Sequence, residues 1–209
     1  MGSGLGNSKE MANLINTDQL NELIAHRRSI FPHDYTGGTV PDDMVMQILA
    51  NARWAPTHKL TEPWRFLVFT RDGLKALANF QSDLYKRVTV KNGTFKEDSY
   101  QKLLTKPHLS SHIIAVIMKR DERKSVPEIE EVGAVFCAIQ NMYLTASAYG
   151  LGSYLSTGGI TYFDEAKAFF GLGADDRLIG FFHLGIPKKY HSNAKRKPVE
   201  EVAQWIDSE

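Results

Sequence analysis

The chain has 209 residues, is 43% hydrophobic and carries a formal net charge of +1. This length fits one domain or at most two, and the near-zero charge provides no field that would attract nucleic acid. The single cysteine, Cys137, excludes an internal disulfide and a cysteine-based metal cluster. The sequence shows no signal peptide and no apolar run of the ~18 residues that a membrane span needs, so we expect a cytoplasmic protein without a membrane partner.

The chain begins with a Gly-rich run, so we expect residues 1–15 to form a flexible arm ahead of a single domain over residues 16–209. Asn16 or Thr17 is placed to cap a helix that runs through Arg28. Basic residues in its last turn would oppose the negative end of the helix dipole, which is a purely structural explanation for them.

A second helix is predicted from Pro41 to Ala55, because proline suits the first helical position and a further proline follows Ala55. The segment 55–64 then places His58 and Lys59 in a polar turn between two prolines. Loops held by rigid neighbours are where binding groups concentrate. The alternative is an ordinary Pro-rich connection between a helix and a strand.

Four apolar runs separated by helical patterns predict an α/β or α+β layered fold. The predicted strands cover residues 65–70, 113–118, 152–157 and 179–186. The run 113–118 is apolar throughout, which is typical of a strand buried on both faces. Helical patterns cover residues 130–149 and 164–170, and another begins near residue 74. The polar segment 87–110 is either a lid or a pair of short helices.

The helix over residues 130–149 is apolar nearly all round. Such a helix is expected to be buried nearly all round. In a chain of this size this predicts a central helix that is shared with a second subunit, with Cys137 as a core residue.

Several enzyme classes lack their signatures in this sequence. There is no phosphate-binding Walker sequence and no nucleophile elbow, and the glycines at 150–152 follow a helix, unlike a dinucleotide-binding fingerprint. His108 and His112 are four residues apart and offer the basis of a metal-dependent hydrolase, but without a defined third ligand we interpret them as polar residues beside a strand.

Three separate clusters of cationic and hydroxyl groups remain, at residues 27–29, 58–59 and 195–197, and residues 156–159 add hydroxyls and backbone donors. Each alone is typical of a solvated surface. Together they suit a ligand with a phosphate at one end and a polar heteroaromatic ring at the other, because phosphate binds guanidinium groups, hydroxyls and free amides.

These stretches resemble the nitroreductase family of FMN enzymes, in particular its small single-domain subgroup. The resemblance rests on residues 27–29, on 48–66, and on 150–152 with 180–187, and it extends from about residue 18 to 205 with a closing segment at 196–202. It implies an α+β fold with a central mixed, mainly antiparallel sheet of four to five strands flanked by helices. It also implies an intertwined homodimer with FMN at the subunit interface.

By position, the resemblance implies a set of FMN-binding residues and no catalytic side chain. Arg27, Arg28 and Ser29 would bind FMN, with Arg27 closest to the phosphate, and Arg196 would complete the phosphate site. Trp54 and His58 would reach the flavin from the other subunit. The ring would be lined by Leu155, Ser156 and Thr157.

The implied activity is hydride transfer from NAD(P)H to flavin N5, and from there to a small electron-poor acceptor such as a nitroaromatic, quinone or enone, in a ping-pong cycle. His58 is the candidate for tuning the ring, because histidine gains and loses charge near neutral pH. The alternative is a flavin-binding module with little turnover. Departures from the family leave room for it. Phe31 stands where many relatives have a lysine that contacts the ring, and Leu60 and Glu62 stand where many have amides. Leu155 and Ser156 stand where closer relatives often have a tryptophan and an arginine.

Overall fold

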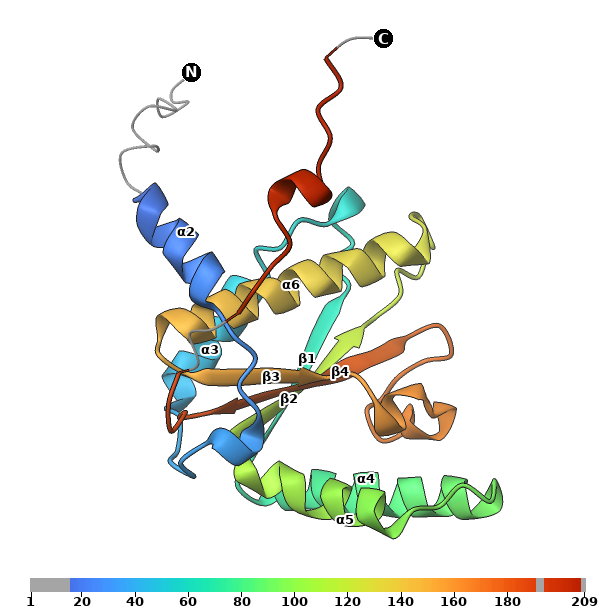
Figure 1. Ribbon diagram of the computed structural model, residues 1–209. Helices are drawn as coiled ribbons and strands as arrows, with labels where there is room; N and C mark the ends of the chain where they lie inside the picture. Colours follow the sequence, from blue (N-terminus) through green and yellow to red (C-terminus); the bar gives the residue numbers. More distant parts are fainter. Residues whose placement is uncertain (1–15, 191–193, 208–209) are drawn as a thin grey trace.

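The computed structural model describes residues 16–190 and 194–207 (Figure 1). The expected arm over residues 1–15 lies outside the described residues. The helices are α2 (Thr17–His26), α3 (Asp42–Ala52), α4 (Asp72–Lys91), α5 (Glu97–Thr105) and α6 (Glu128–Ala148). The strands are β1 (Trp64–Thr70), β2 (His112–Met118), β3 (Gly152–Ser156) and β4 (Arg177–Gly185). Short 3₁₀ turns are η1 (Pro32–Asp34), η2 (His58–Leu60), η3 (Lys106–Leu109), η4 (Gly159–Tyr162), η5 (Asp164–Ala166) and η6 (Val199–Glu201).

The four described strands form one sheet in the order β1-β2-β4-β3, and all three pairings are antiparallel. The fold is therefore α+β, with the lower of the expected strand numbers and without a parallel pair among these strands. β2 lies in the centre and every one of its residues is buried, which confirms the prediction for this run. β3 lies at an edge of the sheet, and its outer side is available to other parts of the molecule.

Helices cover both faces of the sheet, with α3 and α6 on one side and α4 and α5 on the other (Figure 1). The alternation of side chains along β2 divides them between two cores. Ile114 and Val116 pack in the α3–α6 layer, whereas Ile113 and Ala115 pack under α4. One sheet thus supports both cores.

The first helix is shorter than predicted. Asn16 caps it by accepting hydrogen bonds from the backbone N–H groups of Asp18 (2.9 Å) and Gln19 (3.2 Å), but α2 ends at His26 rather than Arg28. The chain leaves the helix because the next residues run along β3, where the N–H of Ile30 donates to the Ser153 carbonyl (2.9 Å).

One further element prediction is confirmed in part, and another needs correction. α4 continues to Lys91, and the rest of the polar segment forms α5 and η3, so its short-helix interpretation is confirmed for residues 97–109. The helix predicted over 164–170 is instead a 3₁₀ turn at Asp164–Ala166, because the short segment turns to bring Phe170 into the α4-side core.

α6 is not buried all round within one chain. Its inner face packs on the sheet, but Ile129 is 74% exposed and Phe136 45% exposed. Cys137 is also exposed, so its prediction as a core residue is wrong. The pattern identified the apolar residues of this helix correctly, but one stripe of them faces away from the core of this chain.

Tyr35 is held by two glycines that face each other across β3 and β4. Gly152 pairs with Gly185, and a Cβ on Gly185 would lie 2.2 Å from the ring atom Cδ2 of Tyr35. The buried Tyr35 hydroxyl donates to the Ile30 carbonyl (2.9 Å). The contact therefore fixes the segment that follows α2 against the edge of the sheet.

Among the described residues, no helix has the length and hydropathy needed to cross a membrane.

We expect Gly185→Ala to lower the free energy of unfolding by about 1–3 kcal/mol, because the new methyl group overlaps the Tyr35 ring. Gly73→Ala in α4 is the matched control. A Cβ there lies 3.8 Å from the nearest atom, an ordinary contact, and alanine in a helix should not lower stability. Urea unfolding of both variants tests this, and a Gly185→Ala protein as stable as the parent would contradict the packing described.

Candidate active site

Arg27 and Ser29, which follow α2, meet the C-terminal half of α6 at Tyr143. The guanidinium carbon of Arg27 lies 4.9 Å from the centroid of the Tyr143 ring. The Ser29 hydroxyl lies 3.4 Å from the Tyr143 hydroxyl. The aromatic ring thus positions a cation beside the end of β3.

Tyr143 also connects this cationic segment to β3. Its hydroxyl accepts a hydrogen bond of 2.7 Å from the N–H of Leu155. The structure therefore brings three of the predicted residues, Arg27, Ser29 and Leu155, around one tyrosine. Tyr143 was not predicted from the sequence, although a tyrosine in an otherwise apolar helix signals a hydroxyl that needs a partner.

The outer edge of β3 offers the Leu155 carbonyl to a ligand. The Ser153 carbonyl and the Leu155 N–H both point away from β4, as their bonds to Ile30 and Tyr143 show. Antiparallel strands present their backbone groups to alternate sides, so the Leu155 carbonyl faces the same open edge. This edge lies directly beside the Arg27 cluster.

A pocket of about 490 Å³ opens where β3 ends, between the sheet and the α4–α5 layer. Leu155, Ser156 and Thr157 all line it, together with Lys106 and His183. This volume lies within the range of small-molecule sites, roughly 300–1,000 Å³. The three residues predicted to line a ring therefore share one concave surface.

His183 of β4 forms part of the pocket floor. Its Nδ1 lies 3.0 Å from the Ser110 hydroxyl and its Nε2 lies 3.4 Å from the Ser156 hydroxyl. Burial lowers the pKa of His183 to about 3, and the nearby charge of Lys106 adds to this effect. The imidazole is therefore neutral at working pH and holds the Ser156 hydroxyl in place.

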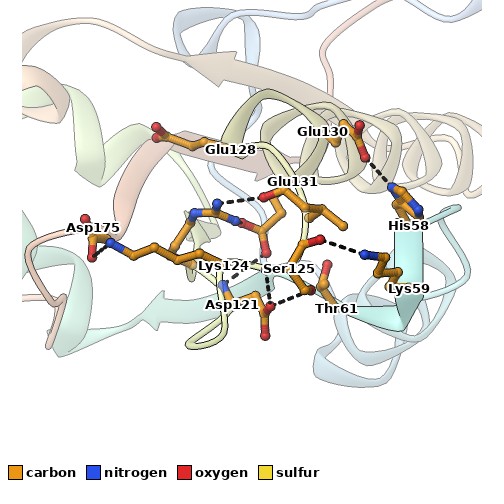
Figure 2. Close-up of polar contacts among 12 residues, drawn as sticks. His58, Lys59, Thr61, Asp121, Lys124, Ser125, Glu128, Glu130, Glu131 and Asp175 are labelled. Carbon is orange, nitrogen blue, oxygen red and sulfur yellow. Dashed lines mark hydrogen bonds and ion pairs between the residues drawn. The ribbon is translucent and has the colours of Figure 1, made fainter.

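His58 lies elsewhere in the chain, at the other end of α6, and Trp54 lies on the segment between α3 and η2. Figure 2 shows His58 bonded through Nδ1 to Glu130, and the Lys59 ammonium donating to the Ser125 carbonyl (2.8 Å). Trp54 is 77% exposed and borders a separate hollow of about 520 Å³. These contacts fix the predicted loop on the first turn of α6.

The loop that carries His58 is strained. Lys59, Leu60 and Glu62 all have positive φ angles (51°, 53° and 43°), which non-glycine residues rarely adopt. Each such conformation costs of order 1–3 kcal/mol and is typical of functional segments. A hydrogen bond from the Glu62 N–H to the Thr57 hydroxyl (3.2 Å) helps to hold the turn.

A buried carboxylate supports the same end of α6. The Glu131 side chain is 1% exposed and pairs with the Arg120 guanidinium, while its other oxygen accepts from the Asp121 N–H (3.0 Å) (Figure 2). Arg120 also donates to the Val126 carbonyl (2.7 Å). A buried charge requires such pairing, so this network fixes the segment that the strained loop rests on.

The two halves of the predicted site are far apart within one chain. Glu130, which holds His58, and Tyr143, which holds Arg27, both belong to α6. At 1.5 Å per residue their Cα atoms are separated by about 20 Å along the helix. One copy of the chain therefore does not bring His58 to the Leu155 edge.

Arg28 and Arg196 complete the predicted set. Arg28 donates to the carbonyls of Ala25 (2.6 Å) and Arg27 (2.8 Å). Arg196 is exposed on the segment after residue 193 and donates to the Lys195 carbonyl (3.0 Å). That Arg196 joins the other cations stays a prediction.

The two histidines considered as metal ligands do not share a helix. His108 lies in η3, whereas the buried His112 begins β2 and contacts Asp42 through Nε2 (3.0 Å). Within the described ranges, no group of three or more His, Cys, Asp or Glu residues could hold a metal ion.

Comparisons with known proteins identify the family of the chain. The sequence model of the Nitroreductase family matches residues 24–186. YfhC of Bacillus subtilis (strain 168), named as an NAD(P)H nitroreductase, is 27% identical over 183 residues, covering 87% of this chain and 91% of that protein. The chain therefore belongs to the nitroreductase family, which confirms the resemblance seen in the sequence.

Solved structures show the same fold. A nitroreductase-like family protein from Bacillus cereus has a TM-score of 0.76 and 26% identity, over 90% of this chain and 96% of that one. A nitroreductase from Desulfovibrio desulfuricans, crystallised in complex with FMN, has a TM-score of 0.66 and 25% identity, over 91% and 98% of the two chains.

We expect acidification to destabilise the protein through His183. Its pKa of about 3 in the fold lies below the ordinary value of 6.5 that it regains on unfolding. The unfolded chain therefore takes up a proton first, and stability falls as the pH drops below 6.5, by up to about 1.4 kcal/mol per pH unit.

Urea unfolding of the parent and of His183→Gln between pH 7 and pH ~4.5 measures this contribution. Asp121, Glu128 and Asp175 have lowered pKa values in the fold. Above pH ~4.5 these carboxylates are largely ionised in the folded and the unfolded chain, so they add little to the pH dependence of stability. The variant should show a shallower slope, and equal slopes would contradict a neutral buried imidazole.

Proposed function

We propose that this protein is an FMN-dependent oxidoreductase that takes electrons from NADH or NADPH and passes them to a small electron-poor acceptor, such as a nitroaromatic, quinone or enone. The observation that carries the proposal is the cluster of Arg27, Tyr143 and Leu155. It joins a cationic segment to an open strand edge beside a pocket. The FMN in the Desulfovibrio protein and the NAD(P)H in the name of YfhC support the choice of cofactor and donor.

The donor set fits FMN. Arg27, Arg28 and Ser29 supply guanidinium and hydroxyl groups for a phosphate. The Leu155 carbonyl and the hydroxyls of Ser156 and Thr157 supply hydrogen-bonding groups for the polar edge of a ring. The side chain of Leu155 is half-buried and offers an apolar wall. Arg196 would add a further cation.

The protein's part in the reaction is to bind, orient and exclude water. FMN supplies reversible two-electron chemistry when it is bound. Tyr143 holds the Leu155 edge at a fixed distance from Arg27, so ring and phosphate contacts are positioned together. His183 remains neutral, so the Ser156 hydroxyl lies against an uncharged partner.

We infer that the site is completed by a second copy of the chain. Glu130, which holds His58, lies about 20 Å from Tyr143 along α6, so His58 reaches a flavin only from another subunit. Exposed apolar residues support a homodimer: Ile129 and Phe136 on α6, and Trp205 (93% exposed) and Ile206 (84%) near the C-terminus. In this proposal residues 16–209 form a single domain. The proposed cytoplasmic location rests on the lone cysteine, which leaves no internal disulfide.

One observation favours the alternative of a flavin-binding module with little turnover. Phe31 stands where many family members carry a lysine, and the centroid of its ring lies 4.5 Å from the centroid of the Tyr154 ring. Anaerobic mixing of the flavin-loaded protein with NADH or NADPH separates the two functions. Prompt bleaching of the flavin supports the enzyme, and a flavin that neither nucleotide bleaches supports the module.

We expect Arg27→Ala to weaken FMN binding by roughly 10- to 100-fold, since a charge-assisted hydrogen bond contributes about 1.5–3 kcal/mol. Arg87→Ala, at an exposed position of α4, is the control for the loss of one arginine. Fluorescence titration of the flavin-free proteins with FMN gives both affinities. An Arg27→Ala protein that binds FMN like the control would remove Arg27 from the phosphate site.

A further inference from the structure

The charged side chains that line the pocket beside β3 are all positive. Two of its lining residues are lysines, Lys102 and Lys106, and its lining contains no aspartate or glutamate. Its remaining polar groups are neutral, including His183, which burial keeps uncharged. Tyr85, Tyr154 and Phe181 add aromatic surface to its walls. A surface of this kind suits a flat ligand that carries a negative charge.

Lys106 is the cation most deeply placed in this pocket. It belongs to η3, and its ammonium lies 4.7 Å from the centroid of the Tyr154 ring. Burial lowers the pKa of Lys106, and no carboxylate in the described part of the chain lies within ion-pair distance of it. A half-buried ammonium without a counter-charge gains most from an anionic ligand.

The position of Lys106 is fixed by the fold and by aromatic packing. Pro107 is buried between α5 and β2 and holds the backbone next to Lys106. The Tyr154 ring beneath the ammonium is itself packed against Phe31 at 4.5 Å. The charge is therefore held beside aromatic surface at the bottom of a pocket that Leu155, Ser156 and Thr157 also line.

We propose that Lys106 selects, as the electron acceptor, an aromatic compound that bears a negative charge, such as a carboxylate or a phenolate on the ring. The inference rests on the proposed function: with the flavin ring at the Leu155, Ser156 and Thr157 edge of this pocket, the acceptor would lie against its Lys106 and Tyr154 side. It assigns to Lys106 the recognition of charge and to the aromatic walls the recognition of the ring. Lys102 lies more exposed at the pocket lining and contributes a weaker, solvent-screened attraction.

The test compares two acceptors of nearly equal shape, 4-nitrobenzoate and 4-nitrobenzamide, with the FMN-loaded protein. The readout is the ratio of their kcat/KM values. In Lys106→Gln this ratio should fall at least tenfold, and Lys106→Arg should retain most of it. Lys75→Gln, an exposed lysine of α4, removes the same charge away from the pocket and should leave the ratio unchanged.

Other outcomes overturn the proposal. If Lys106→Gln slows both acceptors equally, Lys106 acts on the flavin or on the fold and not on acceptor charge. If it raises the KM for NADH or NADPH while the acceptor ratio stays constant, the lysine binds a nucleotide phosphate instead. An acceptor ratio that Lys106→Gln leaves at the parent value overturns the proposal as well.

Calorimetry separates a failure of this inference from a failure of the proposed function. Benzoate and benzamide are not reduced, so their binding to the FMN-loaded protein can be measured without turnover. Benzoate should bind at least tenfold tighter than benzamide, and Lys106→Gln should abolish the difference. A protein that shows this preference but is not bleached by either nucleotide retains the anion site and loses the oxidoreductase function. Equal affinities for the two compounds overturn the anion site itself.

Discussion

The 21-residue helix α6 fixes the distance between the two parts of the proposed site. Its first turns are held by the buried Glu131, which pairs with Arg120 and accepts the Asp121 N–H. Its C-terminal half presents Tyr143 to Arg27 and to the N–H of Leu155. Because a helix is rigid over this length, the strained His58 loop and the Arg27 cluster are kept about 20 Å apart in every copy of the chain.

This separation explains why the molecule carries features that a single chain leaves unused. The His58 loop stores backbone strain, Trp54 is exposed, and one stripe of α6 with Ile129 and Phe136 is apolar and uncovered. Exposed apolar surface of this kind is typical of interaction sites. A second copy that covers α6 would bring the loop of one chain to the strand edge of the other.

Much of the fold could be predicted from local sequence patterns. The continuous apolar run of β2 and the capping Asn16 acted as their residue types predict. Long-range contacts were out of reach: α2 ends early because Ile30 pairs with β3, and no local pattern shows this. The same reason hid Tyr143 and Lys106, whose importance depends on the side chains that the fold brings to them, whereas Cys137 was misplaced because an apolar helix does not reveal which stripe faces outward.

The most direct measurement of the central claim is sedimentation velocity of the flavin-loaded protein, followed at ~450 nm where bound flavin absorbs. If both copies build the site, the flavin absorbance sediments at the mass of two chains, and dilution that separates the chains releases free FMN. Flavin that sediments with a single chain would show that Arg27, Tyr143 and the β3 edge hold it alone, and would contradict the shared site.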